Sequence, residues 1–471
     1  MDLTSSARVT VFSQWIRFAA QIVGFIALSR LLTPADFGIV AMVAPIVTVA
    51  LLFADLGFGL AAVQAPSLTA GQKSTLFYIN VAAGGLGALV IAALGPVLAS
   101  FYRQPELIPL AAVLATTLVF SGISSQFRVE LNRDLRYRTM AIQDVIASLL
   151  ALAAGVGGAL VGWGYWAIAA QTVVQGIVIM AMGIAQARWF PGRPVRLGEV
   201  RSLLRFGVNA LVVQAMNYTS STVDVIALGR AQGATELGLY SRASQLVSMV
   251  FIQVTGPLTR VMLPRLSASA ADDTAFAYDL IRTQRAVSYV LLLMVSLLAA
   301  TAPFAAVSLF GPDWAPLGPL AQILCAGAVF QAMGMVYYWA LLARARTGLL
   351  VIGELPGRAV MIIGAVALAP LGAAWVAAAI SVGQLVIFVG SSVAVSRANI
   401  GAGALIRGAL QPLAVGAYAA AVALGVSVLV PAAPALQLVT TAFAWALAVF
   451  STLALQPIRR RIIDVLALVR R

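Results

Sequence analysis

Runs of about 20 predominantly apolar residues recur along almost the whole chain and constrain its fold more than any other feature. Each run is long enough to cross a hydrocarbon core of roughly 30 Å as a helix. Only 10% of the 471 residues are charged, against roughly 25% in soluble globular proteins. Because a spanning segment must satisfy its backbone hydrogen bonds internally, we expect an all-α integral membrane protein without a separate soluble domain.

Hydropathy and turn signals together predict about 14 transmembrane helices. The predicted spans are residues 9–32, 36–63, 75–100, 107–127, 139–162, 164–187, 204–229, 236–259, 286–310, 315–340, 348–369, 372–396, 406–430 and 435–456. The first run lacks a small-residue cleavage site followed by a polar mature chain. We therefore expect it to remain in the protein as the first span.

Basic residues in the loops predict the orientation of these spans. When loops are assigned alternately to two sides, all but three of their cationic residues fall on the side of the N-terminus, the exceptions being Arg30, Arg103 and Arg230. The positive-inside rule then places both termini in the cytoplasm. The net charge of +14 is explained by these loops, so we expect no nucleic-acid partner.

The scarcity of metal-binding residue types excludes several classes of function. The chain has one cysteine and no histidine, which argues against disulfides, the usual Cys/His metal sites and redox cofactors. A phosphate-binding loop of the form GxxxxGK[ST] is missing, so ATP is not expected to drive the protein directly. We expect no cofactor, no metal and no enzymatic activity.

Two segments of the sequence repeat at a fixed offset. SRLLTPADFG, residues 29–38, and GRAQGATELG, residues 229–238, share an arginine, an acid and a glycine at the same spacing, each pair 200 residues apart. The match either is a coincidence in an apolar chain or marks a duplication, and its equivalent topological position favours duplication. It predicts two pseudo-symmetric six-helix bundles plus two C-terminal helices. The corresponding domains are an N-terminal bundle 1–187, a cytoplasmic linker 188–205, a C-terminal bundle 206–397, helices 13 and 14 in 398–458, and a basic cytoplasmic tail 459–471.

Polar side chains form matching stripes on the first and seventh spans. Gln14, Arg17 and Gln21 lie at i, i+3 and i+7, on one helix face. The seventh span carries an equivalent stripe: Gln214, Asn217, Ser221 and Asp224. Charges inside spans are costly and usually face water or a partner, so the stripes predict a shared central cleft. Arg17 alternatively extends its stem to the cytoplasmic interface.

Further charged residues inside the spans fall into two groups. Arg242 and Asp55 are expected to border the same cleft, and Asp55 and Asp224 are candidates for taking up protons or sodium. Glu354 and Arg358 are four residues apart and are expected to form a structural pair, with a lateral groove as the alternative. The glycine clusters at 84–87 and 155–158 are expected to allow close helix packing.

Several motifs resemble a known family of transporters. WIRFAAQIVGFIALSRLLTPADFGIVAMV (15–43), LNRDLRYR (131–138) and LGLYSRASQL (237–246) are similar to the polysaccharide transporters of the multidrug/oligosaccharidyl-lipid/polysaccharide (MOP) exporter superfamily. The similarity is greatest to the Wzx-type flippases of lipopolysaccharide and exopolysaccharide repeat units.

This resemblance implies a V-shaped pair of bundles in the bacterial cytoplasmic (inner) membrane that works by alternating access. The implied substrate is an undecaprenyl-pyrophosphate-linked oligosaccharide, moved from the inner to the outer leaflet for O-antigen, capsule or exopolysaccharide synthesis. Membrane lipids, the glycan polymerase and the export machinery are the implied partners. Arg17, Arg242 and Arg30 occupy the positions expected to hold pyrophosphate, while the sugar hydroxyls would be bound by Gln14, Gln21, Gln214, Asn217 and Asp224.

Three other functions remain open at this stage. A lipid II-type flippase shares the span count and a cationic cavity, whereas a proton- or sodium-coupled drug antiporter of the same superfamily would have twelve spans and an acidic cavity. A membrane glycan polymerase would need a long outward loop with catalytic residues, and the predicted outward loops are short.

Overall fold

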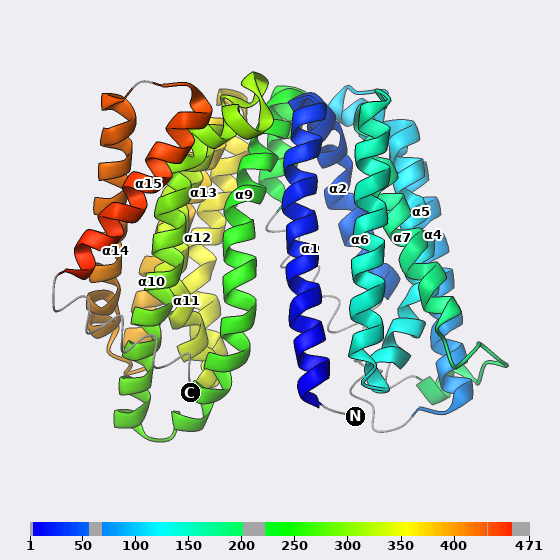
Figure 1. Ribbon diagram of the computed structural model, residues 1–471. Helices are drawn as coiled ribbons and strands as arrows, with labels where there is room; N and C mark the ends of the chain where they lie inside the picture. The colour runs from blue at the N-terminus through cyan, green and yellow to red at the C-terminus, as the bar shows by residue number, and fades with distance from the viewer. Residues whose placement is uncertain (1–2, 56–67, 201–221, 431, 455–471) are drawn as a thin grey trace. The chain divides into compact units, whose positions relative to one another are not determined.

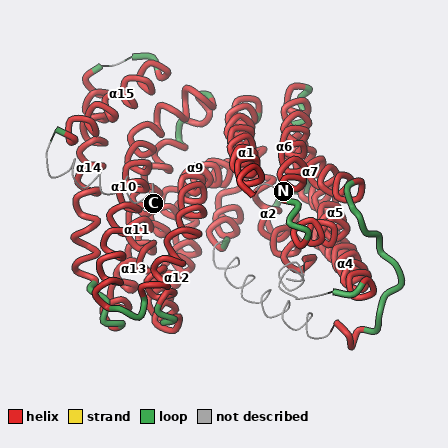
Figure 2. The backbone as a smooth tube through the Cα atoms, turned by 60° about the horizontal axis from the view of Figure 1, so that its bottom comes forward, coloured by secondary structure: helices red, strands yellow, loops and turns green. Residues whose placement is uncertain are grey.

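A computed structural model describes residues 3–55, 68–200, 222–430 and 432–454. The described part is helical, and Figures 1 and 2 show no strand in it. Within it, twelve helices are long and apolar enough to cross a membrane. The predicted span 9–32 corresponds to α1 (Leu3–Leu31), which at 1.5 Å per residue is roughly 43 Å long. The predicted span 204–229 lies mostly outside the described residues, so the total of 14 stays a prediction.

The chain divides into two compact units, Met1–Gly238 and Leu239–Arg471. The division falls inside the long helix α9 (Val223–Ser269), which contains a non-helical residue, Gly233, with φ +80°. Glycine adopts this conformation without the steric cost that a Cβ would bring. The bundle and linker boundaries predicted from the sequence are not decided by this division and remain predictions.

The first unit is built from long helices that pack side by side (Figure 1). Helix α1 packs on α6, α2 packs on α4 and α5, and α7 packs on α5 and α6. The bounds of these elements are α2 Pro34–Asp55, α4 Ala70–Tyr102, α5 Leu107–Arg133, α6 Tyr137–Leu160, α7 Tyr165–Ala185 and the short 3₁₀ helix η1 Leu197–Val200.

The acid of the first repeat segment, Asp36, has a local structural role at the start of α2. The Thr33 backbone N–H donates to the Asp36 carboxylate at 2.9 Å, and the Asp36 backbone N–H donates to the Thr33 hydroxyl at 3.3 Å. This reciprocal arrangement caps the helix, and Pro34 occupies its first position. The acid in the motif is therefore a helix-capping residue.

Glycines allow close contact between α4 and α5. A Cβ on Gly84 would lie 2.5 Å from the Leu118 carbonyl oxygen, and a Cβ on Gly122 would lie 2.5 Å from that of Asn80. The prediction of close packing is confirmed for Gly84, and also for Gly87, Gly155 and Gly158, where an added Cβ would lie 2.7, 3.1 and 2.9 Å from a neighbouring side chain. It is wrong for two other members of the clusters, Gly85 and Gly157, where a Cβ would meet nothing within 4 Å because they lie on the outer helix faces.

In the second unit, α10 is the central helix, packing on α11, α14 and α15, while α13 packs on α11 and α12. A hydrogen bond of 3.0 Å from the Trp445 indole N–H to the Ser296 hydroxyl joins α15 to α10. The bounds are α10 Asp273–Ala305, a π-helical turn η2 Ala306–Phe310, η3 Pro312–Trp314, α11 Leu317–Ala343, α12 Thr347–Leu368, η4 Ala369–Leu371, α13 Ala373–Arg397, α14 Ala402–Leu429 and α15 Pro434–Leu453.

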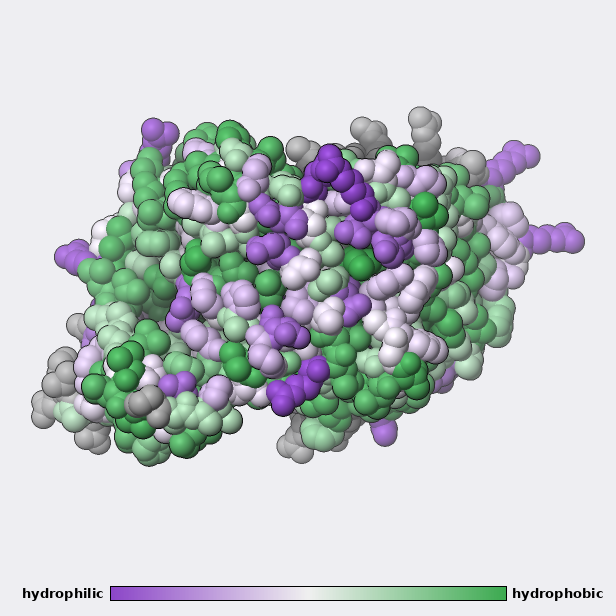
Figure 3. Space-filling view, turned by 90° about the horizontal axis from the view of Figure 1, so that it is seen from above, coloured by the Kyte–Doolittle hydropathy of each residue, from purple (hydrophilic) through white to green (hydrophobic). Residues whose placement is uncertain are grey.

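Large apolar side chains project outward from both units, as expected where helices face lipid. Leu86 and Leu89 on α4 and Val351 and Leu355 on α12 are each more than half exposed. The face in Figure 3, seen along the helices, carries polar residues (purple) as well as apolar ones (green). Apolar surface on the sides of the helices fits a multi-pass membrane protein.

Candidate functional site

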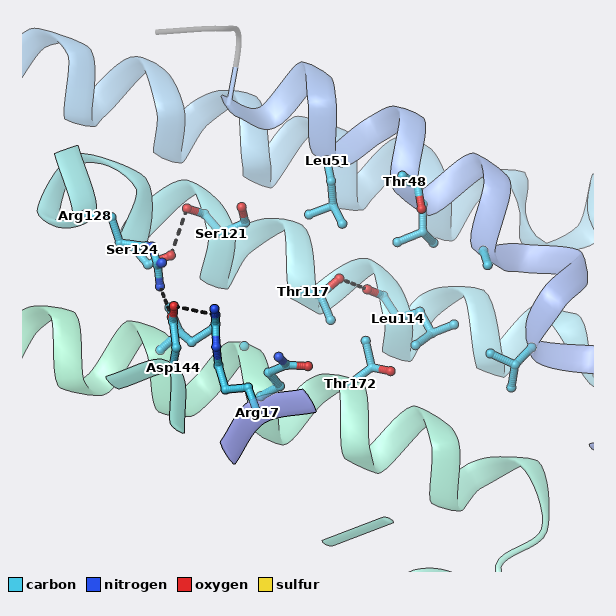
Figure 4. A pocket seen from close by; sticks show the side chains of 16 residues that line it. Arg17, Thr48, Leu51, Leu114, Thr117, Ser121, Ser124, Arg128, Asp144 and Thr172 are labelled. Atoms are coloured by element: carbon cyan, nitrogen blue, oxygen red, sulfur yellow. Dashed lines mark hydrogen bonds and ion pairs between the residues drawn. The ribbon is translucent and has the colours of Figure 1, made fainter. Parts of the chain in front are cut away.

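A cavity of about 520 Å³ opens among helices α1, α2, α5, α6 and α7 of the first unit. This volume lies within the range of sites that hold small organic ligands, roughly 300–1,000 Å³. Apolar residues line one part of the wall, and charged and hydroxyl side chains line the rest (Figure 4). The polar lining residues are Arg17, Thr48, Thr117, Ser121, Ser124, Arg128, Asp144, Thr172 and Gln175.

Two arginines of the cavity share one carboxylate. Arg17 on α1 donates from Nη1 to Asp144 Oδ2 at 2.9 Å, and Arg128 on α5 donates from Nη1 to Asp144 Oδ1 at 2.8 Å. Figure 4 shows the three side chains converging at one end of the cavity. The Arg17 side chain keeps 41% of its accessible surface and Arg128 keeps 30%, so both guanidinium groups remain open to the cavity.

The hydroxyl groups of the cavity are arranged mainly as acceptors. Thr117 donates to the Leu114 carbonyl at 2.6 Å, Ser124 to that of Ser121 at 3.2 Å, and Thr172 to its own helix at 2.9 Å. Because each hydroxyl proton is used within its own helix, the oxygen lone pairs remain available to accept hydrogen bonds. A ligand rich in O–H donors, such as a sugar, suits this part of the wall.

The cavity also carries net positive charge. Two guanidiniums against one carboxylate leave one positive charge in excess, among helices whose other lining residues are neutral. Guanidinium groups bind carboxylate and phosphate oxygens through charge-assisted hydrogen bonds. The arrangement can bind an anion at one end and hydrogen-bond a polar, uncharged group along the wall.

Of the residues predicted on the first span, only Arg17 lines this cavity. Gln14 and Gln21 have exposed side chains on α1 and are outside the lining set. Arg30 lies in the last turn of α1 and is exposed. The stripe Gln14, Arg17 and Gln21 therefore does not enter the cavity as a group.

The remaining predicted site residues lie in other parts of the chain. Arg242, in the second unit, is buried and donates to Gln245 at 2.8 Å. Asp224 is half-buried in the first turn of α9. Gln214, Asn217 and the side chain of Asp55 lie outside the described residues. The predicted shared cleft and the ion-coupling roles of Asp55 and Asp224 remain predictions.

Glu354 and Arg358 form an ion pair within α12 of the second unit. Arg358 Nη2 and Nε lie 2.7 and 3.1 Å from Glu354 Oε2, the geometry that i, i+4 spacing favours. The structural role of the Glu354–Arg358 pair remains a prediction.

Sequence reasoning missed two of the three charged residues of the cavity. Arg128 directly follows the predicted span 107–127, yet α5 continues to Arg133. Asp144 lies in α6, one helix further along the chain. The available signal was the excess of hydroxyl residues on α5, at Thr117, Ser121 and Ser124, which places a polar stripe on the face that leads to Arg128.

Comparison with known proteins shows the family of the chain. Residues 27–319 match the family described as polysaccharide biosynthesis protein, which is more than half of the chain. The chain belongs to this family.

Curated relatives are similar over most of their length. The chain is 25% identical to the teichuronic acid biosynthesis protein TuaB of Bacillus subtilis (74% of this chain, 72% of the relative). It is 23% identical to the lipopolysaccharide biosynthesis protein WzxC of Escherichia coli (73% and 70%). It is 24% identical to the succinoglycan biosynthesis transport protein ExoT of Rhizobium meliloti (79% and 80%).

Solved structures of MOP-superfamily transporters share the fold. The lipid II flippase MurJ in an inward closed conformation superposes with a TM-score of 0.72 at 12% identity, covering 95% of this chain and 99% of MurJ. An inward-facing multidrug resistance MATE transporter gives a TM-score of 0.63 at 15% identity, covering 83% and 96%. At these identities the likeness concerns the fold alone.

Proposed function

We propose that this protein is a flippase that moves undecaprenyl-pyrophosphate-linked oligosaccharide repeat units from the inner to the outer leaflet of the bacterial cytoplasmic membrane. The observation that carries the proposal is the pair Arg17 and Arg128 at the end of a hydroxyl-lined cavity among membrane helices. The names of the curated relatives support a polysaccharide pathway. Basic loops on the side of the N-terminus support cytoplasmic termini.

The physical requirements of such transport match the chemistry of the cavity. A head group of several sugars cannot cross hydrocarbon unaided because its hydroxyls would lose their hydrogen bonds. Acceptor oxygens such as those of Thr117 and Ser124 replace water for the sugar, and the guanidiniums of Arg17 and Arg128 bind the phosphate oxygens. The lipid tail stays in the bilayer, and no covalent bond is made or broken.

The test is mass spectrometry of undecaprenyl-pyrophosphate lipids in cells depleted of the protein. Depletion is expected to make an intact repeat unit accumulate, and wild type is expected to clear it. Arg17→Ala is expected to clear it at least about tenfold more slowly, the loss that corresponds to about 1.4 kcal/mol, and Arg17→Lys at an intermediate rate because it keeps only the charge.

Arg138→Ala serves as the matched control, since Arg138 is an exposed arginine of the same unit outside the cavity. Depletion without accumulation of any lipid-linked oligosaccharide contradicts the proposal. Accumulation of the peptidoglycan precursor lipid II would instead assign the protein to cell-wall synthesis. Equal clearance by wild type and Arg17→Ala would show that Arg17 does not contribute to substrate binding.

A further inference from the structure

Asp144 occupies the place in the cavity where an anionic ligand is expected. Its two carboxylate oxygens each accept from a different arginine, Arg17 at 2.9 Å and Arg128 at 2.8 Å. Arg17 on α1 is 127 residues from Asp144 on α6, whereas Arg128, on the preceding helix α5, is 16 residues from it. One carboxylate thus bridges two cations in the way that one phosphate group would.

The bridge leaves much of the arginines' donor capacity unused. A guanidinium carries five N–H donors, and each arginine directs one Nη1 atom at Asp144. The Nε of Arg17 is buried and lacks a hydrogen-bond partner in the described part of the chain. A buried donor without a partner is costly, so a ligand with more acceptor oxygens than a carboxylate would satisfy this site better than Asp144 does.

The charges in the cavity also indicate that a phosphate ligand and Asp144 exclude one another. The cavity holds two positive charges and one negative charge, so a diphosphate would face the repulsion of Asp144 as long as the carboxylate stays between the arginines. Carboxylate and phosphate oxygens accept hydrogen bonds from the same N–H groups of a guanidinium. The two anions therefore compete for Arg17 and Arg128.

We infer that Asp144 is an internal competitor for the substrate's phosphate groups, an inference that rests on the proposed function and assigns this residue a role in selecting and releasing the substrate. A diphosphate displaces Asp144 because it brings more charge and more acceptor oxygens. A neutral polar head, or one with a single carboxylate, does not. After translocation, Asp144 returns to the two arginines and promotes dissociation of the phosphate.

The test uses the full-length protein in lipid nanodiscs and inorganic pyrophosphate as the probe, with binding measured by isothermal titration calorimetry. Asp144→Asn removes the competing charge and is expected to bind pyrophosphate at least about tenfold more tightly than wild type. Asp144→Glu keeps a competing carboxylate and is expected to stay within about threefold of wild type. Acetate is expected to compete weakly in Asp144→Asn and not in wild type.

Glu130→Gln is the matched control because it removes a carboxylate that pairs with Lys73 at 2.5 Å in the same unit, outside the cavity. It is expected to leave pyrophosphate affinity unchanged. If Asp144→Asn is not recovered as a folded protein, the smaller Asp144→Ser replaces it with the same expectation. Equal or weaker pyrophosphate binding by the variant without the carboxylate overturns the inference.

The two proposals fail separately. If Asp144→Asn binds pyrophosphate more tightly but depleted cells accumulate no lipid-linked oligosaccharide, the competitor role stands and the substrate assignment is wrong. If depleted cells accumulate the oligosaccharide while Asp144→Asn and wild type bind pyrophosphate equally, the proposed flippase function stands. Asp144 is then a structural counter-ion. In cells, Asp144→Asn is expected to clear the lipid more slowly than wild type despite tighter binding, because release is impaired.

Discussion

Gly38 and Gly238, which the 200-residue offset aligns, make reciprocal contacts in the first unit. A Cβ on Gly38 would overlap the Ala234 carbonyl oxygen, and a Cβ on Gly238 would overlap the Pro34 carbonyl oxygen. Pro34 and Ala234 are also 200 residues apart, so the contact repeats with its two partners exchanged. A two-fold relation between duplicated segments would produce such reciprocal contacts. At both positions glycine is needed because two backbones approach closely.

The first prediction follows from this contact. Gly38→Ala and Gly238→Ala are each expected to destabilise the protein by roughly 1–3 kcal/mol or more, the range for inserting a methyl group into a fully packed site. Thermal unfolding in detergent, followed by tryptophan fluorescence, is the measurement. Gly85→Ala is the control, because a Cβ there meets nothing within 4 Å. A melting temperature for Gly38→Ala equal to that of Gly85→Ala would contradict the prediction.

The sequence predicted the all-helical, membrane-spanning architecture because that property depends on local patterns. Apolar runs long enough to span a membrane locate helices directly. The turns after α5 and α11 have the same local structure. After α5, Leu135 has φ 55° and the Arg136 N–H donates to the Leu131 carbonyl. The turn after α11 does the same, with Ala345 at φ 54° and Arg346 donating to Leu341.

The cavity was harder to predict because its chemistry depends on which helices are neighbours. Arg17 and Asp144 are 127 residues apart, and helical periodicity identifies a face without naming what packs against it. Gln14 and Gln21 share the face of Arg17 in sequence yet have exposed side chains outside the cavity. The ion pairs among α1, α5 and α6 could therefore be identified only from the folded structure.

The second prediction concerns Arg344 at the end of α11. Its guanidinium lies 4.3 Å from the centre of the Phe276 ring and 2.5 Å from Asp273. The Asp273 side chain is 87% exposed, so its ion pair contributes little, and the cation–π contact is expected to dominate at about 1–2 kcal/mol.

Arg344→Ala should therefore lower the free energy of unfolding by about 1–2 kcal/mol, and Asp273→Asn by less than about 0.5 kcal/mol. Both are measured by thermal unfolding at low and high salt. The larger effect should persist at 1 M salt because ring contact is less screened than an exposed ion pair. Equal losses in the two variants would mean that the ion pair, rather than the ring, holds this arginine.

The third prediction is a pH dependence at the start of α10. Hydrogen bonds from the Thr274 hydroxyl, at 2.6 Å, and from the backbone N–H groups of Ala275 and Thr274 lower the pKa of Asp272 below its ordinary value of 3.8. A depressed folded-state pKa contributes stability that is present above the unfolded pKa and is lost as the pH falls through the folded pKa.

Asp272→Ala should thus be less stable than wild type at pH 7, and the difference should shrink below about pH 3.8. Asp272→Asn retains an N-cap acceptor but has no titrating group, so its stability relative to Asp272→Ala should not change over this range. Melting temperatures between pH 3 and pH 7 provide the check. A constant gap between wild type and Asp272→Ala would show that the carboxylate's charge does not contribute to the cap.

The last prediction distinguishes Arg128 from Arg138, an exposed arginine of the same unit outside the cavity. Removing Arg128 leaves Arg17 and Asp144 as a neutral pair, so the cavity loses its excess positive charge. Arg128→Ala is expected to slow clearance of the lipid-linked oligosaccharide by at least about tenfold, and Arg128→Lys by less, because a lysine keeps the charge and loses the planar fork. Arg138→Ala, which removes an exposed arginine ten residues further along, should clear it at the wild-type rate. If both alanine variants slow clearance equally, the effect comes from the overall basic charge of that side, and the cavity has no special role for Arg128.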